Sequence, residues 1–198
     1  MTSPSQEQPV RLRTPFELED LQTLRSGDPV LLSGTVLTAR DAAHSRFAQA
    51  IASGEALPVE LAGQTIYFVG PTPARPGHAI GSAGPTTASR MDPYAPLLIE
   101  KGLRAMIGKG RRSLAVRQSM MTGRCVYFGA VEGTAALLSR CITASKVIAY
   151  ADLGTEAVHR LVVADFPAFV VNDLYGGDLY ESGPAQWRTA ESSRKIAP

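Results

Sequence analysis

Short apolar runs alternate with helix-like segments and glycine-rich turns along most of the chain. Runs rich in Val, Ile, Leu and aromatic residues predict strands at residues 29–39, 65–69, 105–107, 125–130, 146–150, 161–163 and 168–171. Helical propensity predicts helices over 40–53, 86–102, 112–122 and 133–139. Strands alternating with helices indicate an α/β fold. Consecutive strands at both ends of the chain favour a mixed sheet flanked by helices.

Glycine and proline interrupt this pattern in several places. Gly34 lies inside the 29–39 strand, where a bulge or a close backbone approach is expected. Gly54 should end the first helix, and Pro93 and Pro96 should confine the regular part of the second. Residues 70–85 (GPTPARPGHAIGSAGP) hold too much Gly and Pro for a helix or a strand. We therefore predict a long loop, which in a compact domain is usually functional or disordered.

The 198 residues suffice for one well-buried domain. Residues 1–13 and 183–198 are polar and aperiodic and are expected to be tails, so the domain is predicted to span 14–182. The 44% apolar and 19% charged content is typical of globular proteins. With a net charge of +2 and no long run of like charges, a nucleic-acid surface is not expected. A few convergent arginines would instead suit a small anion.

No membrane or metal signal stands out in the sequence. No apolar run approaches the roughly 18–20 residues that span a bilayer, and the polar start lacks the apolar core of a signal peptide. We therefore expect a cytoplasmic protein. Cys125 and Cys141 have no metal-type spacing and are expected to be thiols rather than a disulfide. Two cysteines cannot supply the three or four thiolates that an iron–sulfur cluster normally requires.

The motif TARDAAH, residues 38–44, lies at a predicted strand-to-helix junction. It places Arg40, Asp41 and His44 within about one helical turn, so a cation, a carboxylate and an imidazole can share one small surface. An ordinary helix start, with Asp41 near the positive end of the helix dipole, explains the same residues. Both interpretations stay open on these residues alone.

A second motif, GSAGPTTASR, covers residues 81–90. Its glycines, Gly84 among them, let the backbone approach a ligand, and its proline suits the first turn of a helix. Thr86 or Thr87 can cap that helix or present a hydroxyl where free N–H groups attract anions. Arg90 follows Thr86 by four residues, so hydroxyl, amides and guanidinium can converge on one carboxylate. A simple capped helix is the alternative, but the glycine-rich approach favours a binding site.

A third motif, MIGKGRR, covers residues 106–112. It places Lys109 at the carboxyl end of a predicted strand, a habitual place for ligands in α/β sheets. The spacing of a nucleotide-binding P-loop is missing. Lys109 as a solvated loop residue is equally compatible with the sequence. Arg111 and Arg112 are expected to be solvated.

Other polar residues carry weaker signals. Asp152 and Glu156 are four residues apart and could pair for acid–base chemistry. Two carboxylates on an exposed turn are more often structural or interface residues, which is what we expect here. His78 and His159 have no partners at ligand spacing, so neither is assigned a role.

Together, TARDAAH, GSAGPTTASRMD, MIGKG, and ADLGTEAV with DFPAF resemble the β subunit, or C-terminal domain, of class I fumarate hydratases. The resemblance covers about residues 12–180 in one consistent order. The related L-tartrate dehydratase β subunits share the threonine–arginine and GKG features. The DAAH form of the first motif is more similar to the fumarase branch, whereas GKGRR departs from the GKGG or GKGN of many relatives.

The resemblance implies a swivelling β/β/α domain that closes over a separate α subunit, in a hetero-oligomer such as α2β2. That partner, not this chain, would hold a [4Fe-4S] cluster, whose open iron polarises the substrate's hydroxyl and carboxylate. Arg40, Arg90 and Lys109 would hold the dicarboxylate, and Thr86 would take the proton from the carbon beside a carboxylate. Thr86 and Lys109 are thus the expected catalytic residues, and the general acid would come mostly from the partner. The expected supporting residues are Asp41, His44, Gly84 and Thr87.

The function implied is the reversible hydration of fumarate to L-malate, a reaction of the tricarboxylic acid cycle. His44 would orient Asp41 or Arg40, or would be a structural histidine. Two alternatives stay open: an L-tartrate dehydratase β subunit, and a non-catalytic domain that senses a dicarboxylate through the same arginines.

Overall fold

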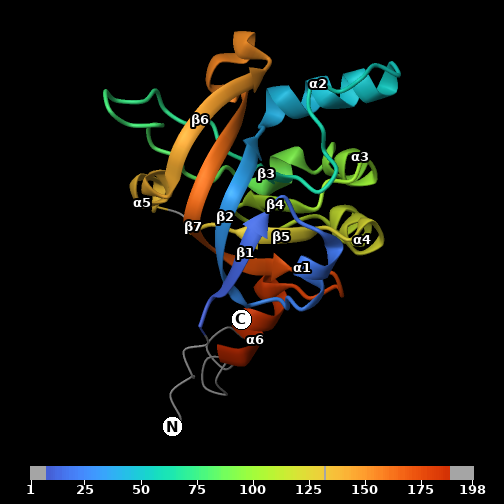
Figure 1. The fold of residues 1–198 in the computed structure, drawn as a ribbon. Helices are drawn as coiled ribbons and strands as arrows, with labels where there is room; N and C mark the ends of the chain where they lie inside the picture. Colours follow the sequence, from blue (N-terminus) through green and yellow to red (C-terminus); the bar gives the residue numbers. More distant parts are fainter. Residues whose placement is uncertain (1–7, 132, 188–198) are drawn as a thin grey trace, which may run out of the picture.

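The computed structural model describes residues 8–131 and 133–187, which form a mixed sheet flanked by helices (Figure 1). The strands are β1 (Val10–Thr14), β2 (Pro29–Thr38), β3 (Thr65–Tyr67), β4 (Ala105–Gly108), β5 (Val126–Gly129), β6 (Ile142–Ala149) and β7 (Val158–Asn172). The α-helices are α1 (Leu18–Gln22), α2 (Asp41–Ala52), α3 (Ala95–Glu100), α4 (Leu114–Gly123), α5 (Ala135–Arg140) and α6 (Leu179–Trp187). Two 3₁₀ helices are η1 (Ala88–Met91) and η2 (Ala151–Glu156). The predicted α/β class is confirmed.

The strand order β1-β2-β3-β4-β5-β7-β6 combines parallel and antiparallel pairing. Strands β1 to β5 pair in parallel, as expected where helices connect successive strands. The long β7 runs antiparallel to β5, β6 and β2. Because β7 contacts both β5 and β2, the strands β2, β3, β4, β5 and β7 form a closed ring.

Successive strand residues point into two separate cores, as the period of two in a strand requires. In β3, Ile66 belongs to the core beneath the helices and Tyr67 to the core enclosed by the ring. In β4, Met106 and Ile107 divide in the same way. Helices α2, α3 and α4 contribute Phe47, Leu98 and Met120 to the outer core, and they lie on one side of the sheet in Figure 1.

The bulge expected at Gly34 is confirmed. The β2–β7 register shifts between Leu32 and Gly34, and Gly34 has a φ of +114°. A Cβ at Gly34 would lie 2.1 Å from the carbonyl oxygen of Thr14. Glycine is therefore required both for the backbone conformation and for the close approach of β1.

Several elements differ from the sequence-based expectation. The predicted strands 161–163 and 168–171 are parts of the single strand β7, which passes Asp165 in a left-handed conformation (φ +48°). The segment 86–102 contains η1 and α3 rather than one helix, because of its prolines. The short helix α1 was not expected. Residues 70–85 form neither helix nor strand, which confirms the predicted loop.

The expected tails overlap two of the observed elements. Residues 10–13 belong to β1, and α6 runs from Leu179 to Trp187, so part of the segment 183–198 is helical. Residues 1–7 and 188–198 lie outside the described part of the chain. Among the helices that are described, none is long and apolar enough to cross a bilayer.

Candidate functional site

The carboxyl ends of β2, β3 and β4 lie side by side and carry the residues singled out in the sequence. The parallel register aligns Thr38 of β2 with Tyr67 of β3, and Tyr67 with Ile107 of β4. Arg40 and Lys109 therefore leave neighbouring parts of one sheet edge. This edge is the usual ligand-binding edge of a parallel sheet.

Arg40 and Arg90 both contact Asp41. Arg90 Nε donates to Asp41 Oδ1 at 2.8 Å, and Arg40 Nη2 lies 3.6 Å from Asp41 Oδ2. Glu156, from η2, lies 3.6 Å from Arg40 Nη2 and accepts a hydrogen bond from the Ala42 N–H at 2.9 Å. Two guanidinium groups and two carboxylates thus form one cluster, in which Arg90 is more exposed than the other three side chains.

Glu156 belongs to this cluster, although its spacing from Asp152 in the sequence does not predict a contact with Arg40. Asp152 instead pairs with Arg46, at a distance of 2.9 Å between its Oδ1 and Arg46 Nη1. This pair lowers the pKa of the Asp152 carboxyl. The two carboxylates therefore have separate partners and do not form an acid–base pair.

The loop after β3 lies directly against Arg40. A Cβ at Gly70 would lie 2.7 Å from Arg40 Nη1 and 3.1 Å from Arg40 Cδ. Glycine at this position leaves the space that the Arg40 side chain occupies.

His44 is buried (1% exposed), and it supports Arg40 through the backbone. Its Nδ1 lies 2.9 Å from the Arg40 carbonyl oxygen, and its ring packs against Phe47, Phe68 and Tyr94. Burial lowers the pKa of His44 to about 4, so the ring is neutral and Nδ1–H donates to the carbonyl. His44 contacts the backbone of Arg40, not its guanidinium.

Thr86 and Thr87 lie in an extended segment, not in the first turn of a helix. The Thr86 N–H donates to the Phe68 carbonyl at 2.7 Å, and the Lys109 N–H donates to the Thr86 carbonyl at 3.2 Å. The Ala88 N–H donates to the Lys109 carbonyl at 2.8 Å. The segment therefore extends the sheet between the ends of β3 and β4. Thr87 directly precedes η1, but its side chain makes no capping hydrogen bond to that helix.

Gly84 lies where this segment passes α5. A Cβ at Gly84 would lie 3.0 Å from the Ala135 Cβ. Its small size therefore serves the packing of the segment against the helix.

Arg112 was expected in solvent, and this expectation is wrong: Arg112 is 4% exposed. Its guanidinium lies between the rings of Phe68 and Tyr127, 5.2 and 5.3 Å from their centroids, and its Nε is 2.8 Å from Asp92 Oδ1. Burial lowers the pKa of Arg112, which Asp92 opposes. Asp92 also accepts a bond from the Ser113 N–H at 2.7 Å. Asp92 and Arg112 thus connect the threonine–arginine segment (residues 86–90) to the lysine loop (residues 109–113).

Sequence reasoning missed Arg112 because GKGRR contains two adjacent arginines. Only the fold separates them: Arg111 is exposed, and its Nη2 donates to the Tyr180 carbonyl at 3.0 Å. No local pattern distinguishes the two.

A pocket of about 470 Å³ opens beside Lys109. It is lined by Thr87, Lys109, Gly110, Gly129, Ala130, Val131, Phe169, Val171, Leu179 and Tyr180. Arg40, Thr86 and Arg90 are outside this lining. The predicted site residues therefore form two groups along one sheet edge, joined by the segment from Thr86 to Arg90.

The cysteines do not fit a metal site. Cys125 is buried and burial raises the pKa of its thiol to about 12, while partial burial raises the pKa of Cys141. Cys125 belongs to the outer core and Cys141 packs against the core inside the ring, so the two thiols do not share one site. Within residues 8–131 and 133–187, no group of three or more His, Cys, Asp or Glu side chains is arranged to hold a metal ion.

The fold and site define a class: a mixed α/β domain with cationic side chains at the carboxyl ends of its parallel strands. Comparison with known proteins gives the family. The family described as "Fumarase C-terminus" matches residues 1–183. The chain belongs to this family.

Individual relatives agree with this assignment. "Fumarate hydratase 2" of Leishmania major is 38% identical over 175 residues, covering 86% of this chain and 31% of the relative. "Fumarate hydratase class I, aerobic" of Escherichia coli (strain K12) is 38% identical over 152 residues, covering 76% of this chain and 28% of the relative. "Putative L(+)-tartrate dehydratase subunit beta" of Methanocaldococcus jannaschii is 34% identical over 169 residues, covering 82% of this chain and 87% of the relative. The chain thus matches about a third of the length of these fumarate hydratases and most of the tartrate dehydratase subunit.

Proposed function

We propose that this chain is the β subunit of a two-subunit hydro-lyase that reversibly hydrates fumarate to L-malate. A separate α subunit would hold the [4Fe-4S] cluster, in a hetero-oligomer such as α2β2. One relative supports this division, because the chain covers 87% of a protein named as a subunit beta. The cysteines of this chain do not fit a cluster site.

The observation that supports the proposal is that Arg40 and Arg90 share Asp41, and that Arg40 and Lys109 follow strands whose carboxyl ends are in register. Removal of a proton beside a carboxylate builds negative charge on that carboxylate. Fixed cations aimed at this charge stabilise the transition state more than the ground state. Arg40 and Arg90 are held in place by Asp41 and Glu156, so little reorganisation is needed when the charge develops.

Thr86 and Lys109 are the proposed catalytic residues. Their backbones are joined by the bond from the Lys109 N–H to the Thr86 carbonyl, so the two side chains start from adjacent positions. A threonine hydroxyl accepts a proton from carbon only when nearby cations favour its deprotonated form. Lys109 and Arg90 would supply that positive charge.

A second candidate is an L-tartrate dehydratase β subunit, favoured by the coverage of 87% of one such relative. The two functions differ in one substrate hydroxyl. Turnover of fumarate, mesaconate and L-tartrate by the chain co-purified with its α subunit distinguishes them. Fumarate as the best substrate would support the first proposal, and L-tartrate the second.

Replacement of Arg90 tests the assigned site in the same complex. Arg90→Ala should lower kcat/KM for fumarate, because a charge on the substrate loses its partner. The loss should correspond to about 2–5 kcal/mol of transition-state binding energy. Arg46→Ala is the matched control, since Arg46 also pairs with an aspartate but lies on the α2–η2 surface with Asp152. Equal kcat/KM values for the two variants would remove Arg90 from the site.

A further inference from the structure

Gly110, which follows Lys109, is held by two tyrosine hydroxyls from different elements. Gly110 has a φ of +81°, a left-handed conformation that favours glycine. Its N–H donates to the Tyr180 hydroxyl at 3.1 Å, and its carbonyl accepts from the Tyr127 hydroxyl at 3.1 Å. Tyr127 comes from β5, whereas Tyr180 comes from α6.

These bonds complete the fixation of the lysine loop. The N–H and the carbonyl of Lys109 are already bonded to Thr86 and Ala88. The four backbone groups of Lys109 and Gly110 thus have partners on three separate parts of the chain. Of these partners, Tyr180 is the most distant from Lys109 along the sequence, and it also lines the pocket beside Lys109.

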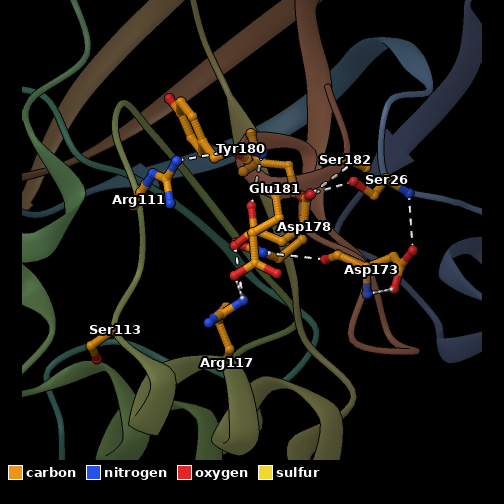
Figure 2. Close-up of polar contacts among 12 residues, drawn as sticks. Ser26, Arg111, Ser113, Arg117, Asp173, Asp178, Tyr180, Glu181 and Ser182 are labelled. Atoms are coloured by element: carbon orange, nitrogen blue, oxygen red, sulfur yellow. Dashed lines mark hydrogen bonds and ion pairs between the residues drawn. The ribbon is translucent and has the colours of Figure 1, made fainter. Parts of the chain in front are cut away.

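The first turn of α6 is itself anchored to the domain, as Figure 2 shows. The Tyr180 N–H donates to Asp178 Oδ1 at 2.8 Å. Arg117 of α4 reaches Asp178 Oδ2 at 3.0 Å and Glu181 Oε1 at 2.8 Å. Asp178 is buried, so its ion pair with Arg117 is shielded from solvent more than a surface pair.

The lysine loop makes a second contact with this turn. Arg111 donates to the Tyr180 carbonyl at 3.0 Å and lies over the Tyr180 ring, 5.6 Å from its centroid (Figure 2). The loop and the helix therefore hold each other through both the backbone and the side chain of Tyr180.

We infer that Tyr180 is a positioning residue for Lys109: its hydroxyl fixes the Gly110 peptide and thereby the direction in which the lysine leaves the sheet edge. The inference rests on the proposed function, in which Lys109 binds a substrate carboxylate. It assigns a role in the site to α6, a part of the chain that the sequence motifs do not include.

Tyr180→Phe is the sharpest test, because it removes the hydroxyl and keeps the ring that Arg111 contacts. Tyr175→Phe is the matched control: Tyr175 is 52% exposed, and its hydroxyl donates to the Gln22 carbonyl at 2.8 Å, on a different surface. Each variant of the full chain is co-purified with the α subunit. Steady-state hydration of fumarate gives kcat and KM, and hydrogen exchange followed by mass spectrometry gives the protection of peptides that contain Gly110.

We expect Tyr180→Phe to lower kcat/KM for fumarate roughly tenfold, since small displacements of a binding group cost rate steeply. KM should rise because Lys109 also holds the carboxylate in the ground state, and kcat should fall because the same cation stabilises the charge that develops in the transition state. A merely structural defect would reduce the active fraction and lower kcat at constant KM. Peptides containing Gly110 should exchange faster in Tyr180→Phe and as in the wild type in Tyr175→Phe.

Each outcome separates the inference from the proposed function. A wild-type complex that neither hydrates fumarate nor dehydrates L-tartrate contradicts the proposed function. An active wild-type complex with the same KM in Tyr180→Phe and Tyr175→Phe overturns the inference alone. Unchanged protection of Gly110 in Tyr180→Phe also overturns it, because the hydroxyl would then not fix that peptide.

Discussion

Arg40 depends on two residues that do not carry its charge. His44 holds the Arg40 carbonyl through its buried ring, and Gly70 leaves the space that the Arg40 side chain occupies. At the scale of single residues, the placement of the Arg40 guanidinium therefore depends on a neutral His44 ring and on glycine at position 70.

The buried His44 should make stability depend on pH. Its pKa is lowered from 6.5 to about 4, chiefly by burial, with Arg112 lowering it further and Asp41 opposing. His44 therefore binds a proton below pH 6.5 in the unfolded chain, but only below about pH 4 in the folded chain. The stability contribution is complete above pH 6.5 and is lost as the pH falls from 6.5 towards 4.

Urea unfolding at pH 7.5 and at pH 5 measures this effect. The wild-type chain should lose about 2 kcal/mol from this group between the two conditions. His44→Gln keeps a side-chain N–H donor and does not titrate, so its loss should be smaller by about that amount. The same pH dependence in both proteins would contradict a neutral buried His44.

Local motifs located some site residues and missed others, for a physical reason. Arg40 and Asp41 share one strand-to-helix junction, so their proximity follows from the sequence. Arg112 contacts Asp92, and Tyr180 contacts Gly110, only in the folded chain. Sequence spacing reports neighbours within a turn, and these contacts are longer in range or require knowledge of burial.

At the scale of elements, β2 organises the sheet because it pairs with β1, β3 and β7. Its position was predictable from one apolar run interrupted by Gly34. The closed ring was not predictable, because it depends on β7 being one long strand that reaches both β2 and β5. Two short apolar runs do not indicate that the residues between them continue the strand.

Gly34→Ala should destabilise the domain by about 2–5 kcal/mol, from a left-handed backbone and from a Cβ only 2.1 Å from the Thr14 carbonyl oxygen. Gly77→Ala is the matched control: its φ is +78°, but a Cβ there would meet nothing within 4 Å. The control should lose only about 1 kcal/mol. Chemical unfolding of both variants gives the comparison, and equal losses would contradict a close approach of β1 to β2.

At the scale of the whole molecule, the ring and its outer helices make a rigid support with the candidate residues along one edge. Lys109 leaves β4, Arg40 leaves β2, and the segment from Thr86 to Arg90 joins them. This arrangement presents cations and a hydroxyl, but its cysteines do not suit a metal site. Our proposal adds a cluster-bearing partner to this arrangement, and this division between two subunits is its central claim.

Fumarate hydration by the chain alone and by the chain co-purified with a cluster-bearing α subunit tests this claim most directly. We predict that the isolated chain forms no L-malate from fumarate and that the complex forms it readily. Formation of L-malate by the isolated chain, at a rate comparable with that of the complex, would contradict the proposed division between the two subunits.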